Sequence, residues 1–350
     1  MPPARLSKWL QPRNEFSSAR FGPDSRTCRG FLLPGDRKRN PLRGMLIVCS
    51  ADWGMQMRQA REDEQKRSHD ERMQTCPLCS SERIRPHDVD FRGMVIDRCA
   101  HCGVKFMNPQ HSDAYLEDLY GGYTELPSDA AEIGSPKHAW RRSIHAYYLS
   151  LVERYTAKGR LLSVGSGDGV EIDAAQRQGW EVEAYEYDRS LSEFIADALG
   201  VRSWVGEFAE IACQPDYFDC VYLHHVLEHP KRPQDYLRAI HRILKPGGIL
   251  FIACPNIESP AAKWKTLLGR LGLKKRRGRH YDTWHHLFYY SPRVLKRILE
   301  EHYGFDVAHI RNGLGEQMRS HSQSSLRHAM AWDGILPVWR SVFVLIARKR

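Results

Sequence analysis

Residues 161–169 read Leu-Leu-Ser-Val-Gly-Ser-Gly-Asp-Gly, a short apolar stretch that leads directly into alternating glycines. The apolar part predicts a β-strand that begins at Arg160. The glycines predict a tight turn after it, where the lack of side chains lets a ligand approach the backbone closely. Residues 169–179, GVEIDAAQRQG, have the pattern of a helix. A strand, a glycine-rich turn and a helix in this order are typical of open α/β sheets that bind ligands at the ends of their strands.

The same alternation of strand and helix continues to the C-terminus. Residues 190–200, 233–248 and 291–304 have helical patterns, whereas strand patterns occur at 181–188, 201–206, 218–226, 249–256, 305–311 and 341–349. Strands that alternate with helices through short connections predict a parallel sheet wrapped by helices, a doubly wound α/β fold.

A carboxylate follows the second predicted strand. Glu186 lies 17 residues after Gly169. An acidic residue at this strand end can accept two hydrogen bonds from a ribose diol. The alternative is an exposed loop carboxylate without a ligand, but the preceding glycine turn favours the ribose role.

Six segments, taken in order, resemble a known family. They read LLSVGSGDG, AYEYD, GEFAEI, FDCVYLHHVLEHPKRP, LKPGGILFIACPN and HHLFYYSPRVLKRILEEHYGFDV. Together they resemble the class I S-adenosylmethionine-dependent methyltransferases, and most of all a bacterial group with the pattern HVLEH…LKPGG…PN. The resemblance covers about residues 160–311, and residues 341–348 fit the last strand of the family. It implies a Rossmann-like methyltransferase sheet and S-adenosylmethionine as cofactor. A dinucleotide site is the competing interpretation of the glycine turn, but HVLEH and LKPGG have no place in that fingerprint.

The resemblance also implies roles for individual residues. The methionine part of the cofactor would be lined by Gly165, Gly167 and Gly169. Near the sulfonium and the methyl acceptor would be His224 and His225. The two histidines, just past the fourth strand, are the candidate catalytic residues because a neutral imidazole near the acceptor can remove a proton.

The rest of the cofactor would contact three further side chains. Glu186 would hold the ribose hydroxyls, Tyr187 would flank the adenine, and Glu207 would lie near the adenine amino group. The chain departs from the family at Ser163, where many members have an acidic residue for the amino group of the cofactor. Serine can accept a hydrogen bond there but supplies no charge.

Four cysteines form two pairs with metal-ligand spacing. The pairs are Cys76-x2-Cys79 and Cys99-x2-Cys102, separated by 19 residues. Two such turns supply the four thiolates of a tetrahedral zinc site, so the spacing predicts a structural zinc ribbon. A redox function would need only one pair. His87 and His101 are alternative ligands, although solvated surface histidines fit them better. The ribbon with its following tyrosines (Tyr115, Tyr120 and Tyr123) resembles the N-terminal part of methyltransferases that act in sugar, polysaccharide and natural-product pathways.

The net charge of +10 is unevenly distributed. Residues 1–72 carry a net charge of +6 and residues 259–282 one of +7, which leaves the rest slightly acidic. A nucleic-acid footprint needs a basic face on the folded domain itself, so this distribution disfavours nucleic acid as a partner without excluding it. The N-terminal sequence has no secretory pattern, and we expect a cytoplasmic protein.

The insertion at 259–286 combines apolar and basic residues, and at its end come His285 and His286. A basic amphipathic segment, here 263–279, is able to contact an anionic membrane surface or a phosphorylated ligand. A solvated loop that packs a few leucines on the core is the equally supported alternative. With His224, His225 and His229, the two histidines predict a His-rich rim at the acceptor side.

These observations predict four regions. They are a weakly ordered extension (1–72), a zinc ribbon (73–109), a helical linker or lid (110–158) and a methyltransferase domain (159–350). The predicted function is methyl transfer from S-adenosylmethionine to a small-molecule or sugar/glycan-type acceptor. The alternatives are an RNA- or protein-directed methyltransferase, and a non-catalytic binding protein suggested by Ser163.

Overall fold

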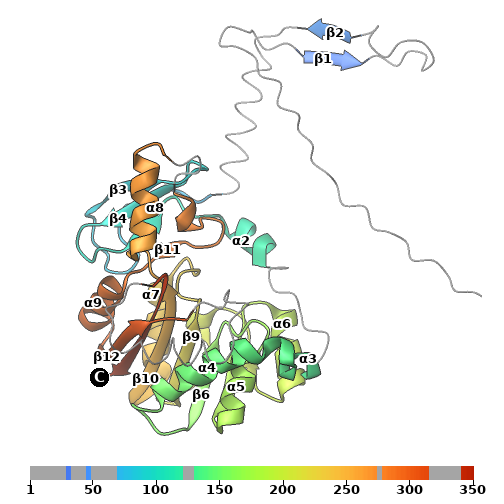
Figure 1. Ribbon diagram of the computed structural model, residues 1–350, viewed down its shortest axis with the longest axis vertical. Coiled ribbons are helices and arrows are strands. Elements are labelled where there is room, and N and C mark those ends of the chain that lie inside the picture. Colours follow the sequence, from blue (N-terminus) through green and yellow to red (C-terminus); the bar gives the residue numbers. More distant parts are fainter. Residues whose placement is uncertain (1–28, 33–44, 49–68, 121–129, 274–277, 315–339) are drawn as a thin grey trace, which may run out of the picture. The chain divides into compact units, whose positions relative to one another are not determined.

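The computed structural model describes residues 29–32, 45–48, 69–120, 130–273, 278–314 and 340–350 (Figure 1). The chain divides into two compact units, Met1–Lys66 and Arg67–Arg350. In the first, strands β1 (Arg29–Leu32) and β2 (Met45–Val48) form an antiparallel pair. Most of the predicted extension, together with Tyr123 and the basic run 274–277, lies outside the described residues.

A seven-stranded sheet forms the centre of the second unit, in the order β12-β13-β10-β9-β6-β7-β8. The strands are β6 (Arg160–Val164), β7 (Glu181–Tyr185), β8 (Ser203–Trp204), β9 (Phe218–His224), β10 (Leu244–Pro255), β12 (Phe305–Asn312) and β13 (Val342–Lys349). β6, β7, β8, β9 and β10 run parallel, as predicted.

The prediction of a wholly parallel sheet is wrong for its last strand. β13 lies between β10 and β12 and is antiparallel to both, so the sheet is mixed. An apolar strand has the same residue pattern in either direction. Its direction depends on how the chain returns between residues 312 and 342, which the strand pattern does not encode.

Alternate residues of the strands point to opposite faces of the sheet. On one face, Leu161, Cys220 and Phe251 share a buried cluster with residues of helices α4 (Ala139–Val152), α5 (Val170–Gln178) and α6 (Arg189–Leu199). On the other, Leu162 and Val221 pack with residues of α7 (Pro233–Ile243) and α9 (Pro292–His302). Helices therefore cover both faces of the sheet, which confirms the doubly wound α/β fold.

A second, antiparallel sheet contains the cysteine pairs. Its order is β11-β5-β4-β3, formed by β3 (Ile84–Val89), β4 (Val95–Cys99), β5 (Lys105–Met107) and β11 (Phe288–Tyr289). β11 follows directly after the insertion (259–286) of the main domain, and its Phe288 pairs with Phe106, 182 residues earlier in the chain. Leu78, Phe106 and Tyr289 are also buried in the same cluster as residues of the main sheet. The small sheet is therefore packed on the domain as part of one compact unit.

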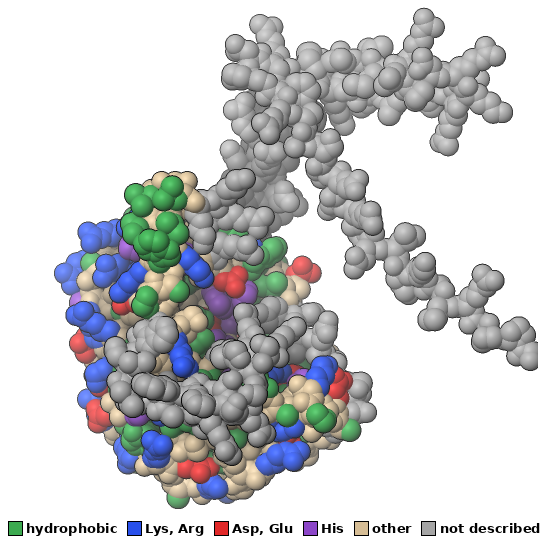
Figure 2. Space-filling model, in the orientation of Figure 1, with side chains coloured by type: hydrophobic (Ala, Val, Ile, Leu, Met, Phe, Trp, Pro, Cys, Tyr) green, Lys and Arg blue, Asp and Glu red, His purple; other side chains and the backbone are tan. Residues whose placement is uncertain are grey.

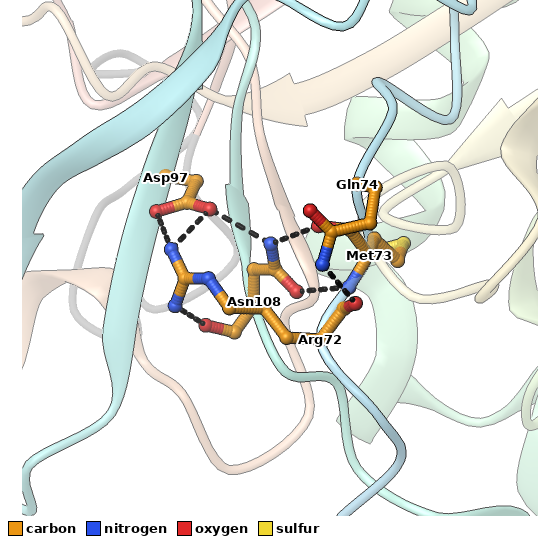
Figure 3. A network of polar contacts seen from close by, with 5 residues as sticks. All are labelled: Arg72, Met73, Gln74, Asp97 and Asn108. Carbon is orange, nitrogen blue, oxygen red and sulfur yellow. Dashed lines mark hydrogen bonds and ion pairs between the residues drawn. The ribbon is translucent and has the colours of Figure 1, made fainter.

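A polar network fixes the chain just before the first cysteine pair (Figure 3). The guanidinium of Arg72 donates to both carboxylate oxygens of Asp97 at 2.7 Å, and the amide of Asn108 donates to Asp97 Oδ2 at 2.7 Å. Asn108 also exchanges two hydrogen bonds with the backbone of Met73. Asp97 is buried, so these donors compensate for the loss of its hydration. The network attaches residues 72–74 to β4 and to the end of β5.

Six further helices complete the described part of the chain. They are α2 (Asp113–Tyr120), α3 (Ala130–Gly134), η1 (Pro136–His138), η2 (Phe208–Glu210), α8 (Pro260–Arg270) and η3 (Arg279–Tyr281). Within the residues that the structure describes, none of the helices has the length and apolar character needed to cross a membrane.

Candidate functional site

The glycine-rich turn lies at the carboxyl end of β6, between β7 and β9. Gly165, Gly167 and Gly169 all have positive φ, at 68°, 53° and 79°. A Cβ atom on Gly165 would lie 2.7 Å from Val226, and one on Gly169 would lie 2.8 Å from Leu199, so a side chain at either position would require its neighbour to move. A Cβ atom on Gly167 would have nothing within 4 Å. The turn thus packs tightly at both ends and is open in the middle.

Glu186 joins this turn from the end of the neighbouring strand. The backbone N–H of Gly167 donates to Glu186 Oε2 at 2.9 Å, and the N–H of Tyr187 donates to Oε1 at 3.2 Å. Burial raises the pKa of Glu186 to about 7, against the effect of these hydrogen bonds. The structure therefore brings the predicted ribose ligand and the predicted glycine turn together. The surroundings of Glu186 disfavour the ionised form of its carboxyl group.

Ser163 is fully buried and bonded to a carboxylate that the sequence analysis did not select. Its hydroxyl donates to Glu171 Oε1 at 2.9 Å, and Glu171 Oε2 lies 4.0 Å from His145 Nε2. Glu171 is in the first turn of α5, two residues after Gly169. An acidic residue in the first turn of the helix after a glycine loop was the signal available for it. The charge that Ser163 lacks is thus present beside Ser163.

The other two predicted cofactor residues lie at the outer side of this edge. Tyr187 is 47% exposed, directly after Glu186. Glu207 precedes η2 after the edge strand β8, and its Oε2 lies 3.7 Å from Arg232 Nη2. Neither side chain packs in the core, so both are accessible to a ligand at the strand ends.

His224 and His225 follow the glycine turn on its other side, at the end of β9. The His224 ring lies 4.7 Å from that of His145 and 5.9 Å from that of Tyr148, between centroids. His225 has a φ of 57°, which is uncommon for a residue other than glycine and is frequent at functional sites. Its Nδ1 lies 3.2 Å from Glu228 Oε1, and its backbone N–H donates to Ala253. The rings of the two predicted catalytic residues lie 4.7 Å apart between centroids, with His224 also against α4 and His225 bonded within the HVLEH turn.

Comparison with known proteins agrees with this geometry. Residues 137–310 match a family model described as "Methyltransferase domain". This part of the chain therefore matches a methyltransferase domain, and its sheet has the Rossmann-like fold of class I S-adenosylmethionine-dependent methyltransferases. Its mixed seven-stranded sheet and the glycine turn at the carboxyl end of β6 fit that assignment.

Among curated proteins, the methyltransferase domain is similar to two enzymes named "Ubiquinone biosynthesis O-methyltransferase". The one from Xanthomonas campestris pv. campestris (strain B100) is 34% identical over 109 residues, which cover 29% of this chain and 45% of that protein. The one from Ruegeria pomeroyi is 33% identical over 122 residues, which cover 33% of this chain and 49% of that protein. The chain spans about half the length of the curated relatives that it matches.

Solved structures give weaker similarities. A possible histamine N-methyltransferase from Thermotoga maritima is 15% identical with a TM-score of 0.43, over 68% of this chain and 99% of that one. An S-adenosylmethionine-dependent methyltransferase from Archaeoglobus fulgidus is 19% identical with a TM-score of 0.42, over 61% and 97%.

The His-rich rim predicted for the methyltransferase domain is assembled in part. His229, His285 and His286 each offer a ring nitrogen, and these nitrogens lie within 4.8 Å of one another. Burial lowers the pKa of His229 to about 4 and that of His286 to about 3, so both imidazoles are neutral at pH 7. His224 lies apart from them against α4, and His225 is linked to this group through Glu228. Glu228, which is almost fully buried, was not selected from the sequence.

The four predicted metal-ligating cysteines also lie together. All four sulfurs are within 4.8 Å of one another. Cys76 Sγ lies 3.7 Å from Cys102 Sγ, and Cys79 Sγ lies 3.6 Å from Cys99 Sγ. Zn–S bonds of about 2.3 Å in a tetrahedron put the sulfurs about 3.8 Å apart. The thiols therefore have the spacing that a zinc ion requires.

The half-buried carboxylate of Glu186 gives a testable pH dependence. Its folded-state pKa of about 7 is above the ordinary value of 4.5. The contribution of the protonated group to stability is therefore complete below pH 4.5 and is lost as the pH rises through 7. We expect Glu186→Gln to raise the free energy of unfolding by about 1–3 kcal/mol at pH 8 and by less than about 0.5 kcal/mol at pH 4.5, measured by urea denaturation.

Glu301→Gln, on the exposed end of α9, is the control and should show no such difference between the two pH values. An equal effect of Glu186→Gln at both pH values would contradict the assigned burial cost.

Proposed function

We propose that this protein is an enzyme that transfers a methyl group from S-adenosylmethionine to an oxygen atom of a small-molecule acceptor. The observation that carries the proposal is the contact of Gly167 with Glu186, since it joins the open glycine turn to a carboxylate on the adjacent strand end. The printed name of the curated relatives, an O-methyltransferase of ubiquinone biosynthesis, favours oxygen as the methylated atom and a small acceptor. A sugar or glycan hydroxyl belongs to the same chemistry.

In this proposal the cofactor lies along the carboxyl ends of β6, β7 and β8. Its methionine part follows Gly165, Gly167 and Gly169, and its amino group is near Ser163 and Glu171. Glu186 accepts hydrogen bonds from the ribose hydroxyls. Tyr187 flanks the adenine ring, and Glu207 lies near its amino group. Because Glu171 supplies a carboxylate beside Ser163, the main reason for a non-catalytic alternative is weakened.

The reaction needs an aligned acceptor and the removal of one proton. The acceptor oxygen attacks the methyl carbon, the O–C bond forms as the S–C bond breaks, and the cofactor leaves as a neutral thioether. Since the sulfonium is already activated, the protein contributes mainly alignment. His225 is the proposed base for the hydroxyl proton, and Glu228 orients its imidazole through Nδ1. By resemblance to the family, His224 would lie near the sulfonium and the methyl acceptor.

We also propose that Cys76, Cys79, Cys99 and Cys102 bind a structural zinc ion. Two turns with a left-handed residue after the second cysteine, Ser80 and Gly103, present the thiols. A small sheet with three short strands of its own has little apolar core, and zinc binding would stabilise it. The cytoplasmic location expected from the sequence stays a prediction.

A third proposal concerns helix α8, which we infer contacts an anionic membrane surface. The described residues around it expose Trp264 (60%), Leu267 (46%), Leu271 (61%) and Leu273 (72%). Figure 2 shows this apolar surface over α8. Lys263, Lys265 and Arg270 are exposed on the same helix. Exposed large apolar side chains with basic neighbours fit a lipid interface better than a solvated loop, and a membrane-borne acceptor would then be within reach.

Cofactor binding tests the central proposal. We expect the wild-type chain to bind S-adenosylmethionine in isothermal titration calorimetry, and Gly167→Ala to weaken binding at least about 10-fold because the new methyl group occupies the cofactor's space. The control is Gly179→Ala at the end of α5. Gly179 also has positive φ and open space around its Cβ position, so it carries the same backbone strain away from the site. Equal affinity of the two variants would contradict the assigned site, and no binding by the wild type would contradict the function.

Zinc content tests the ribbon. We expect Cys99→Ser to lose one equivalent of zinc by mass spectrometry of the metal content, and to lower the thermal midpoint by several degrees, since an ion that binds only the folded state stabilises it. Cys213→Ser changes a buried cysteine that lies outside the four-sulfur group and should retain the full metal content. A Cys99→Ser protein with unchanged zinc would contradict the ligand assignment.

Vesicle binding tests the α8 surface. We expect the combined variant Leu267→Ser and Leu271→Ser to weaken sedimentation with phosphatidylserine-containing vesicles about 10-fold or more, because each buried leucine contributes about 1.5–3 kcal/mol. Val205→Ser, an exposed apolar residue near β8, is the matched control. Undiminished vesicle binding by the leucine variant would overturn the membrane contact. The leucine variant should bind S-adenosylmethionine with the affinity of the wild type.

A further inference from the structure

Three histidines from two distant segments meet beside the HVLEH turn. The ring centroids of His229 and His285 are 5.1 Å apart, those of His229 and His286 are 4.9 Å apart, and those of His285 and His286 are 4.3 Å apart. One nitrogen of each ring lies within 4.8 Å of the other two. Metal–nitrogen bonds of about 2.0–2.1 Å would put such nitrogens about 3–4 Å apart. Small side-chain movements are therefore enough to close the group around one ion.

The backbone holds the two segments together. Both Leu287 and Phe288 donate their N–H groups to the carbonyl oxygen of Glu228, at 2.9 and 3.1 Å. On the other side, Phe288 pairs with Phe106 of β5, and the carbonyl of Thr283 lies 2.7 Å from His111 Nε2. The loop with His285 and His286 is thus bonded to the HVLEH turn and to the small sheet. The histidines are placed by the fold, as a preorganised metal site requires.

One of the imidazoles has the surroundings of a metal ligand. His229 Nδ1 lies 3.2 Å from the backbone carbonyl of His285 and 3.1 Å from the hydroxyl of Tyr120. Metal-bound histidines usually donate their other ring N–H to a carbonyl or carboxylate, which fixes the tautomer. In the tautomer that donates from Nδ1 to the His285 carbonyl, the lone pair is on Nε2. Each of the three side chains keeps some solvent exposure, so an ion can reach the group.

Negative charge lies next to the group. Glu228 precedes His229 directly, is almost fully buried, and is bonded to His225 Nδ1 at 3.2 Å. A buried carboxylate beside three imidazoles would offset the charge of a cation. Packing of aromatic rings alone explains the stacking of His229 on His285. It does not explain why the chain puts a buried acid against three half-buried histidines.

We infer that His229, His285 and His286 bind a divalent transition metal ion of the zinc or iron(II) type, with an open coordination position toward the acceptor. Imidazole ligands suit these ions, and three protein ligands with one open position are typical of catalytic rather than structural sites. The inference rests on the proposed function for its role. The ion would bind the acceptor hydroxyl and favour its ionised form, the proton would pass to His225 or solvent, and the oxygen would attack the methyl group.

Metal binding by the full-length chain tests this inference. The protein is stripped with a chelator and titrated with Co²⁺, followed by its absorption spectrum, and with Zn²⁺, followed by calorimetry. We expect two bound equivalents. One should give the near-ultraviolet charge-transfer bands of thiolate ligation, and the other only the visible bands of nitrogen ligation. The double variant His285→Gln and His286→Gln should keep the thiolate signal and lose the second equivalent. Cys99→Ser should lose the thiolate signal and keep the equivalent with nitrogen ligation.

His302→Gln, an exposed histidine on α9, is the matched control and should bind both equivalents. A single equivalent with thiolate bands alone in the wild type would overturn the inference, even if the histidine variants fail to fold. So would a second equivalent that persists in the double variant.

Calorimetry with S-adenosylmethionine on the same samples separates this inference from the proposed function. Cofactor binding without a second metal equivalent would overturn the metal site and leave the methyltransferase proposal standing. A second metal equivalent without cofactor binding would support the metal site, overturn the proposed function and remove the acceptor role of the ion.

Discussion

The segment from Tyr281 to Tyr290 is the connection on which the candidate site depends. Its strand β11 completes the small sheet by pairing with β5, and its backbone donates twice to Glu228 at the end of the HVLEH turn. Tyr281 and Thr283 add side-chain hydrogen bonds to Asp88 and Asp90 of the small sheet. If this segment moved, the small sheet would lose a strand and the turn would lose two buried donors. The small sheet therefore acts as a support for one wall of the site.

The other wall depends on the order of the parallel strands. β6 lies between β7 and β9, so that its glycine turn has Glu186 on one side and His225 on the other. Parallel strands end at the same edge of the sheet, and residues just past those ends converge whatever their distance in sequence. Gly165 packs closely against Val226 of the HVLEH turn, where a Cβ atom on Gly165 would lie 2.7 Å from the Val226 side chain. The costs visible at this edge, a carboxylate with a raised pKa and a non-glycine residue at positive φ, are typical of sites shaped by binding.

What was predictable from the sequence was local in character. Three features are patterns within short segments: the glycine turn, the acid at the next strand end and the spacing of the cysteines. The structure has the glycine turn and the acid at adjacent strand ends, and it brings the four cysteines together. The direction of β13 and the pairing of β11 with β5 were not predictable, because strand patterns carry no partner or direction. Glu171 was missed for another reason. Its position in the first helical turn after the glycine loop was a signal, but its role depends on a contact with Ser163 across the turn, which a helical pattern does not show.

The two groups of metal-ligand side chains differ in ways that separate structure from chemistry. The four thiols come from two turns of one small sheet, close in sequence, and three of the four cysteines are buried, so an ion among them would have no free position. The three imidazoles come from segments 56 residues apart, are half-buried, and lie beside a buried acid. Bringing them together requires the fold to be complete, including the pairing of β11 with β5. Thiolate ligation would therefore stabilise the small sheet. Imidazole ligation would arise only where the small sheet holds residues 281–290 against the HVLEH turn. In this chain the small sheet with its four cysteines and the group of three histidines consequently belong to one structural system rather than to two adjacent modules.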